Sequence, residues 1–164
     1  MNVQYPLFLK ILTFDRELTT RAGEELVIGV VYQERVRESW LAKDEFLGAV
    51  NASPVKRVHD LSVRAVPIAL TDETDLEHDV ARLGVDIMYV TPLRAFNVSA
   101  ITRISRASSV LTLTGVPDYV DSGIAIGIGI SGEMPQILVN LPAAKAEGAD
   151  LHASLLRIAK LTRN

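Results

Sequence analysis

The sequence contains no cysteine, only three histidines and no block of basic residues. Without cysteine, disulfides, thiolate catalysis and cysteine-bound metal are excluded. His59, His78 and His152 have no second histidine three or four positions away, so no metal-ligand spacing is present. The formal net charge of −3 argues against nucleic acid as the main partner, because such binding calls for a basic face. We therefore expect no metal, no cofactor and no nucleic-acid partner.

Long apolar runs are also absent. No run approaches the roughly 18 residues that a transmembrane helix requires, so we do not expect the chain to span a membrane. The N-terminal residues MNVQYPLFLKIL lack the basic region and small-residue cleavage site of a secretory signal. Two interpretations remain open: a leaderless cytoplasmic protein, or a mature periplasmic chain with an added initiator methionine.

The sequence shows no catalytic pattern. Gly127 and Gly129 lie within an expected strand and Gly132 in the break after it, and they do not lead into a helix, as the glycines of a dinucleotide-binding loop would. The serines lack a nucleophile-elbow pattern. Asp118 and Asp121, like the acidic cluster before Leu76, are typical of helix starts. We therefore predict a non-enzymatic protein without catalytic residues.

What is present is an alternation of apolar strands and amphipathic helices in a chain of 164 residues, 48% of them hydrophobic. Such alternation predicts βαβ crossovers and a parallel sheet. We expect one domain over residues 1–164, a three-layer α/β sandwich of flavodoxin-like or half periplasmic-binding-protein type. The expected strands are Leu26–Tyr32, Val63–Leu70, Val85–Val90 and Val110–Leu113. The expected helices are Tyr5–Leu18, Val36–Val50, Thr71–Leu83 and Leu93–Ser108, with Asn51–Leu61 as a linker.

The last third of the chain predicts an antiparallel hairpin followed by two helices. Ile124–Ile130 and Gln136–Leu141 flank a short glycine-containing break, which is typical of a β-hairpin. Pro142 and Gly148 then stand where a helix would begin and end. Asp150 is expected to cap a final helix with Leu155, Ile158 and Leu161 on one face. Trp40, the only tryptophan, is expected in the core.

The same region resembles the C-terminal signature of the YfiR family, and weaker similarities cover most of the chain. The positions concerned are Leu111-Thr112, Gly123, Asn140-Leu141, Ala143-Ala144, Gly148, Leu155-Leu156 and Ala159, with Lys10–Asp15 and Asp86–Val90 as the weaker ones. The resemblance implies a small bacterial periplasmic regulator that restrains a membrane-bound diguanylate cyclase by binding its periplasmic part. Regulator-type members can carry cysteines, so redox control does not carry over to this chain.

Candidate site residues come from two arguments. In parallel α/β sheets ligands favour the carboxyl ends of the strands, where Gln33, Thr91 and Gly115 are expected. A small-ligand sensor using these ends is therefore the alternative to the regulatory function. For partner binding, Tyr5, Phe8 and Leu12 extend beyond a narrow core stripe on the first helix, although core burial is the other interpretation for Phe8 and Leu12. The same surface could instead form a homodimer.

Overall fold

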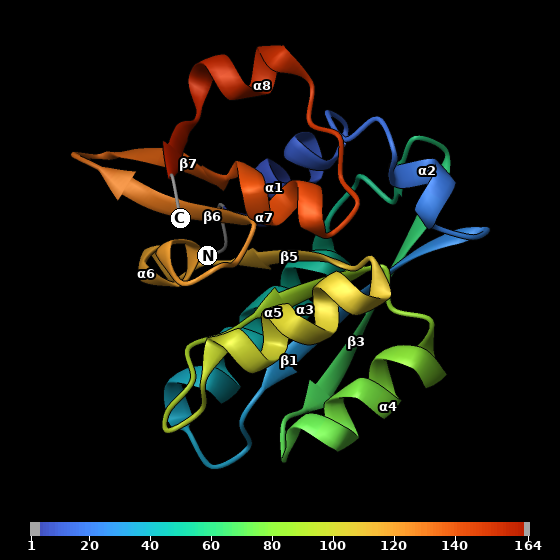
Figure 1. The fold of residues 1–164 in the computed structure, drawn as a ribbon, viewed down its shortest axis with the longest axis vertical. Helices are drawn as coiled ribbons and strands as arrows, with labels where there is room; N and C mark the ends of the chain where they lie inside the picture. Colours follow the sequence, from blue (N-terminus) through green and yellow to red (C-terminus); the bar gives the residue numbers. More distant parts are fainter. Residues whose placement is uncertain (1–3, 163–164) are drawn as a thin grey trace.

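An eight-stranded sheet runs through the molecule in the computed structural model, which describes residues 4–162 (Figure 1). The strand order is β2-β3-β1-β4-β5-β6-β7-β8. Pairing is parallel except between β2 and β3 and between β6 and β7, so the expected mostly parallel sheet with an antiparallel hairpin is confirmed. The strands are β1 Glu25–Tyr32, β2 Arg57–Val58, β3 Leu61–Ala69, β4 Ile87–Val90, β5 Leu111–Thr114, β6 Ile126–Ser131, β7 Met134–Asn140 and β8 Lys160–Thr162.

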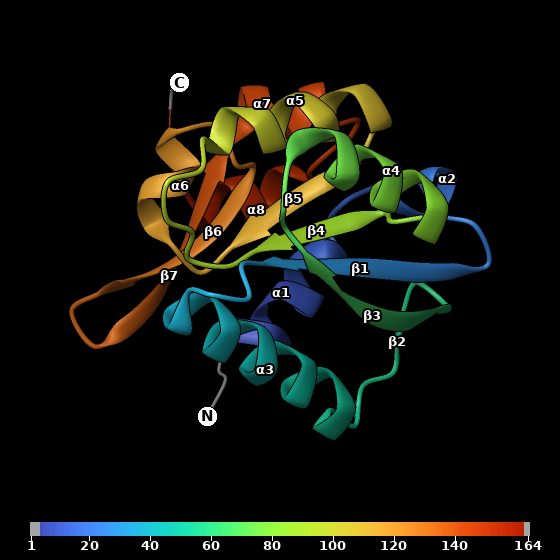
Figure 2. The same ribbon diagram turned by 90° about the horizontal axis from the view of Figure 1, so that it is seen from below.

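Helices cover both faces of the sheet and complete the three layers. Figure 2 shows α1 and α3 on one side of the central strands and α4 and α5 on the other. Two apolar clusters fill the layers: one joins the sheet to α1, α3, α7 and α8, and the other joins it to α4 and α5. The helices are α1 Gln4–Leu12, α2 Leu18–Arg21, α3 Arg37–Ala52, α4 Glu73–Leu83, α5 Val98–Ser108, α6 Pro117–Asp121, α7 Leu141–Ala146 and α8 Ala153–Ile158.

The boundaries of α4 and α5 are set by capping residues. The Asp72 carboxylate accepts a hydrogen bond from Asp75 N at 2.8 Å and begins α4, which ends at Gly84 in the left-handed conformation. The helix expected from Leu93 instead begins at Val98, because Asn97 provides the cap by accepting from Ser99 N. The Pro117 turn continues as the short α6 helix, and the expected linker contains β2.

The first helix is shorter than expected. The apolar spacing predicted a helix to Leu18, but α1 ends at Leu12 and the chain turns around Asp15. The Asp15 carboxylate is fully buried, accepts from Glu17 N and pairs with Arg21 at 2.7 Å. A buried acid that needs these partners favours a turn over a continued helix, because its local hydrogen bonds compete with helical ones.

The C-terminus also departs from the prediction. The cap of α8 is His152, which accepts from Ser154 N, and not Asp150. The helix ends at Ile158, and the residues around Leu161 form β8 alongside β7. By pairing with the edge of β7, β8 satisfies backbone groups of β7 that would otherwise lack a partner strand. The apolar spacing alone could not reveal this pairing.

Trp40 is 44% exposed, so the prediction of a core tryptophan is wrong. The buried face of α3 consists of Ser39, Lys43 and Phe46, which leaves Trp40 at its edge. The Lys43 ammonium lies 4.8 Å from the ring centroids of both Trp40 and Tyr32. The tryptophan therefore covers a nearly buried cation instead of filling the core.

Candidate functional site

The carboxyl edge of the sheet, where ligands were expected, is closed by hydrogen bonds between β1 and β4. Thr91 is fully buried, and its Oγ1 lies 2.7 Å from both Val31 O and Ser39 Oγ. The Gln33 side chain accepts from Arg94 N at 2.7 Å and donates to Arg94 O at 2.9 Å. These polar groups are thus engaged in holding the loop after β4 against the end of β1.

The third predicted residue, Gly115, lies apart from this network. A methyl group at Gly115 would lie 2.7 Å from Gln4 Oε1 and 3.0 Å from the Tyr89 hydroxyl. That hydroxyl donates to Gln4 Oε1 at 3.0 Å. The structure therefore links Gln33 and Thr91 through Ser39, whose Oγ also accepts from Gln33 N, and places Gly115 against α1.

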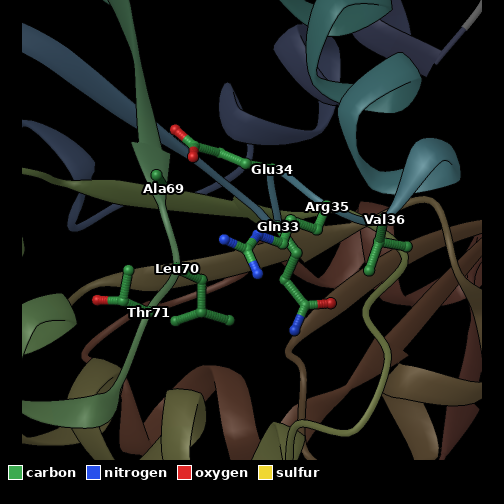
Figure 3. Close-up of a pocket in the computed structure, with 7 residues that line it drawn as sticks. All are labelled: Gln33, Glu34, Arg35, Val36, Ala69, Leu70 and Thr71. Atoms are coloured by element: carbon green, nitrogen blue, oxygen red, sulfur yellow. The ribbon is translucent and has the colours of Figure 1, made fainter.

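An open cavity of about 490 Å³ lies at the same edge, between the ends of β1 and β3 (Figure 3). Its lining residues are Gln33, Glu34, Arg35, Val36, Ala69, Leu70 and Thr71. Figure 3 shows the guanidinium of Arg35 directed toward the segment from Ala69 to Thr71. Thr71 itself donates to the Asp75 carboxylate at 2.9 Å. The lining includes an acidic residue, Glu34, and a basic residue, Arg35, beside apolar side chains. This chemistry suits a small polar molecule.

The residues predicted for partner contact lie in the core. Tyr5, Phe8 and Leu12 are each 1% exposed. The Tyr5 ring meets Phe46 edge-on at 5.3 Å, and Phe46 stacks on Tyr89 at 4.1 Å. Burial raises the pKa of Tyr5 to about 12. All three side chains therefore belong to the apolar cluster that joins α1 to the sheet and to α3.

A buried carboxyl group that sequence reasoning missed is Glu147, which is fully buried at the end of α7. Thr112 donates to it through both its backbone N at 2.9 Å and its Oγ1. Ser105 Oγ lies 2.5 Å from its Oε2. Burial raises the pKa of Glu147 to about 7, although these hydrogen bonds act to lower that pKa. The group joins α5, β5 and α7, so it holds three elements of the fold together.

The pattern of the sequence carries only an indirect signal for Glu147. Its place before Gly148 in an alanine-rich helix is typical of an exposed residue. Two of its neighbours, Thr112 and Gly148, belong to the positions that resemble the YfiR signature. That signature therefore surrounds a buried polar contact.

Within residues 4–162, no three side chains of His, Cys, Asp or Glu gather closely enough to hold a metal ion. No helix in the same range combines the length and apolar character needed to cross a bilayer. The described part of the chain thus presents hydrogen-bond networks and surface concavities as its candidate functional features.

Three solved structures share the fold at low sequence identity. A Streptococcus pneumonia structure, described as an ABC domain in complex with L-Trp, matches with a TM-score of 0.64 and 13% identity, covering 94% of this chain and 60% of that one. A conserved domain protein from Vibrio cholerae matches with a TM-score of 0.62 and 14% identity, covering 98% of this chain and 59% of that one. The ligand-free, open structure of a substrate-binding protein with adhesive properties from Clostridium difficile matches with a TM-score of 0.60 and 16% identity. This match covers 90% of this chain and 58% of that one.

This chain thus spans about three fifths of the length of the structures it matches. At such identities the likeness concerns the fold alone, which is the half periplasmic-binding-protein type expected from the sequence. No curated protein matches the sequence. The model of the YfiR/HmsC-like family, however, matches residues 8–160, nearly the whole chain, and the protein therefore belongs to the YfiR/HmsC-like family.

Proposed function

We propose that the chain acts as one domain, residues 1–164, that regulates a membrane signalling enzyme without catalysing a reaction itself. It would bind the extracytoplasmic part of a partner such as a diguanylate cyclase, in the periplasm, and restrain its activity. The observation that carries this proposal is the family match over residues 8–160. The buried state of Tyr5, Phe8 and Leu12 means that the contact would use other, exposed side chains.

The proposal can be tested in membranes that contain the native partner. The tagged protein should retain a membrane enzyme, and the isolated extracytoplasmic domain of that enzyme should bind directly in calorimetry. Adding the protein to the full-length enzyme should lower cyclic-di-GMP synthesis. A failure to retain any membrane protein, together with turnover of a small metabolite by the pure chain, would overturn the regulatory function.

The cavity between β1 and β3 favours a second candidate function, a small-ligand sensor. Its volume of about 490 Å³ falls within the usual range for ligand sites. Thermal unfolding in the presence of single amino acids, including the L-Trp that accompanies the Streptococcus structure, tests this function. A ligand that binds only the folded state raises the melting temperature. Replacing Arg35 with Ala should abolish that increase if the cavity is the binding site.

A further inference from the structure

A groove runs along the outer face of α1, opposite the core residues discussed above. Its second wall is the segment that connects α3 to β3 and contains β2. The groove has a volume of about 350 Å³. We call it the α1 groove; its lining residues are Pro6, Leu9, Lys10, Thr13, Ser53, Pro54, Val55, Arg57 and Val58.

The floor and walls of the α1 groove are mainly apolar. Leu9 and Val58 are buried beneath it, and the two prolines lie on opposite walls. Val55 is 50% exposed, although it is a large aliphatic residue. An apolar side chain left open to solvent inside a concavity gains free energy when a ligand covers it.

The rim of the α1 groove carries positive charge on a chain whose net charge is −3. Lys10 and Arg57 line it, and among the described residues no carboxylate does. Lys56, next to Arg57, donates to the carbonyls of Val50 and Asn51, and Arg57 donates to Asp60 O. Within residues 4–162, neither Lys10, Lys56 nor Arg57 forms a salt bridge. These cations remain available to pair with an acid from outside.

The two walls are held in a fixed relation before anything binds. His59, in the turn between β2 and β3, lies with its Nε2 at 3.0 Å from Thr13 O at the end of α1. The turn itself is tight, because His59 and Asp60 both adopt positive φ. A groove preformed in this way loses little conformational entropy on binding.

Other exposed apolar residues suit a docking role less well. Ile130 pairs with Pro135 and Ser131 with Met134, so Ile130 and Met134 point to opposite faces of the β6–β7 hairpin. Trp40 and Leu41 are exposed on α3, and neither lines a cavity described here. The α1 groove instead combines a concave apolar floor with charge of one sign.

We propose that the α1 groove docks a segment of the membrane partner that places a large apolar side chain beside an Asp or Glu carboxylate. The apolar side chain covers Val55 and Leu9, and the carboxylate pairs with Lys10 or Arg57. This inference rests on the proposed regulatory function and names the surface that would carry it. It also assigns the occupant a chemistry, acidic and apolar, that the basic rim and apolar floor complement.

Two substitutions test the α1 groove, each with a matched control. Lys10→Glu reverses a rim charge, and Lys145→Glu makes the same change at another exposed lysine in the last turn of a helix. Val55→Asp places a charge on the second wall, and Leu41→Asp places one outside the groove, at a residue of similar exposure on α3. Because all four positions are exposed, each variant should keep the wild-type melting temperature.

Binding to the partner's isolated extracytoplasmic domain should weaken by about tenfold or more in Val55→Asp, as for loss of an interface anchor. Lys10→Glu should mainly slow association and reduce its dependence on salt. Lys145→Glu and Leu41→Asp should bind as the wild type does. Equal binding by all four variants would overturn the groove proposal while leaving the regulatory function intact.

A selection that needs no partner tests the α1 groove separately from the proposed regulatory function. Random short peptides displayed on phage are selected on the wild type and counter-selected on Val55→Asp. The enriched peptides should carry Leu, Phe or Trp beside Asp or Glu and should bind Lys10→Glu more weakly than Lys145→Glu. This result would support the α1 groove even if no membrane enzyme is retained. Enrichment of basic peptides, or none that depend on Val55, would contradict it.

An anionic membrane surface is the other chemistry that a basic apolar groove could meet. Sedimentation with phosphatidylglycerol vesicles, compared with neutral phosphatidylcholine vesicles, tests this. The docking proposal expects no difference between Lys10→Glu and Lys145→Glu in vesicle binding. A loss of vesicle binding confined to Lys10→Glu and Val55→Asp would replace the protein segment with a lipid surface as the occupant.

Discussion

Two buried carboxyl groups, Asp15 and Glu147, tie the C-terminal third of the chain to the rest. Asp15 is fully buried, pairs with Arg21 and accepts from Asp150 N, which is 135 residues away. Arg21 in turn donates to Gly148 O at 3.0 Å. Glu147 lies beside this contact and accepts hydrogen bonds from Thr112. Each group concentrates polar interactions where the sequence pattern indicates only turns and a helix end.

Replacing Asp15 with Ala should destabilise the protein by about 3 kcal/mol or more, because removal of one partner leaves a buried charge on Arg21 unpaired. Chemical denaturation measures the loss. The control is Asp150→Ala, which breaks the exposed pair with Arg16. An exposed pair is worth about 1 kcal/mol or less, so the control should unfold near the wild-type midpoint. Equal effects of the two substitutions would contradict the structural role of Asp15.

Glu147 should make stability fall as pH rises. Its pKa, about 7 in the folded state, exceeds the ordinary value of 4.5 that applies to the unfolded chain. Its stabilising contribution is therefore fully present below about pH 4.5 and is lost as pH rises through about 7. A shift of this size corresponds to about 3 kcal/mol at most.

The substitution Glu147→Gln keeps an acceptor oxygen and a donor group, now an NH₂ with two hydrogens, but removes the titration. Thermal unfolding should show the variant equal to the wild type near pH 5 and more stable than it at pH 8. Asp86, whose pKa burial also raises, leaves some residual pH dependence in the variant. Glu24→Gln, at an exposed position, serves as the control. A variant less stable than the wild type at pH 8 would show that the ionised form is the one the fold requires.

At the scale of elements, the end of α7 depends on backbone conformation. Gly148 follows the C-cap with a φ of 91°, and a side chain there would approach the Arg21 Cδ at 3.1 Å. Gly148→Val should therefore cost about 1–3 kcal/mol, since a β-branched residue tolerates positive φ poorly. Gly23→Val is the matched control, because an added Cβ at Gly23 would meet no described atom within 4 Å beyond its chain neighbours. An unchanged denaturation midpoint for Gly148→Val would contradict this account.

Most elements could be predicted because their signals are local. Asp72 and Gly84 mark the ends of α4, and the apolar runs of β1 and the hairpin mark strands. Two errors arose because a deciding contact lies far away in sequence. The turn after α1 includes a hydrogen bond from Asp150 N to Asp15, and β8 pairs with β7. Trp40 was misplaced for a local reason, because Phe46, not Trp40, lies on the buried face of α3.

The candidate sites were harder to predict than the elements. Gln33 was expected at the carboxyl edge and lies there, beside the cavity. The sequence could not show that its amide and the Thr91 hydroxyl would be engaged with Arg94 and Ser39. The α1 groove left no periodic signal, because more than half of its lining comes from the segment between α3 and β3. Concave surfaces arise from tertiary packing, which spacing along one helix does not encode.

For the whole molecule, the sheet order predicts a gradient of local stability. Strands β1, β4 and β5 have neighbours on both sides and almost no exposed residues. The last strand, β8, pairs only with β7 and follows a short helix. Hydrogen exchange should be slowest in β1, β4 and β5, where it requires global unfolding, and fastest in α8 and β8, which open locally. Equal protection of β8 and β4 would contradict this gradient.

The neutral carboxyl at Glu147 also has a calorimetric consequence. Near pH 6 the folded protein holds its proton, whereas the unfolded chain does not, so unfolding releases about one proton to the solution. The buffer takes up this proton, so its heat of protonation, the negative of its heat of ionisation, adds to the measured heat of unfolding. Apparent unfolding enthalpies in phosphate and in an amine buffer should therefore differ for the wild type and largely agree for Glu147→Gln.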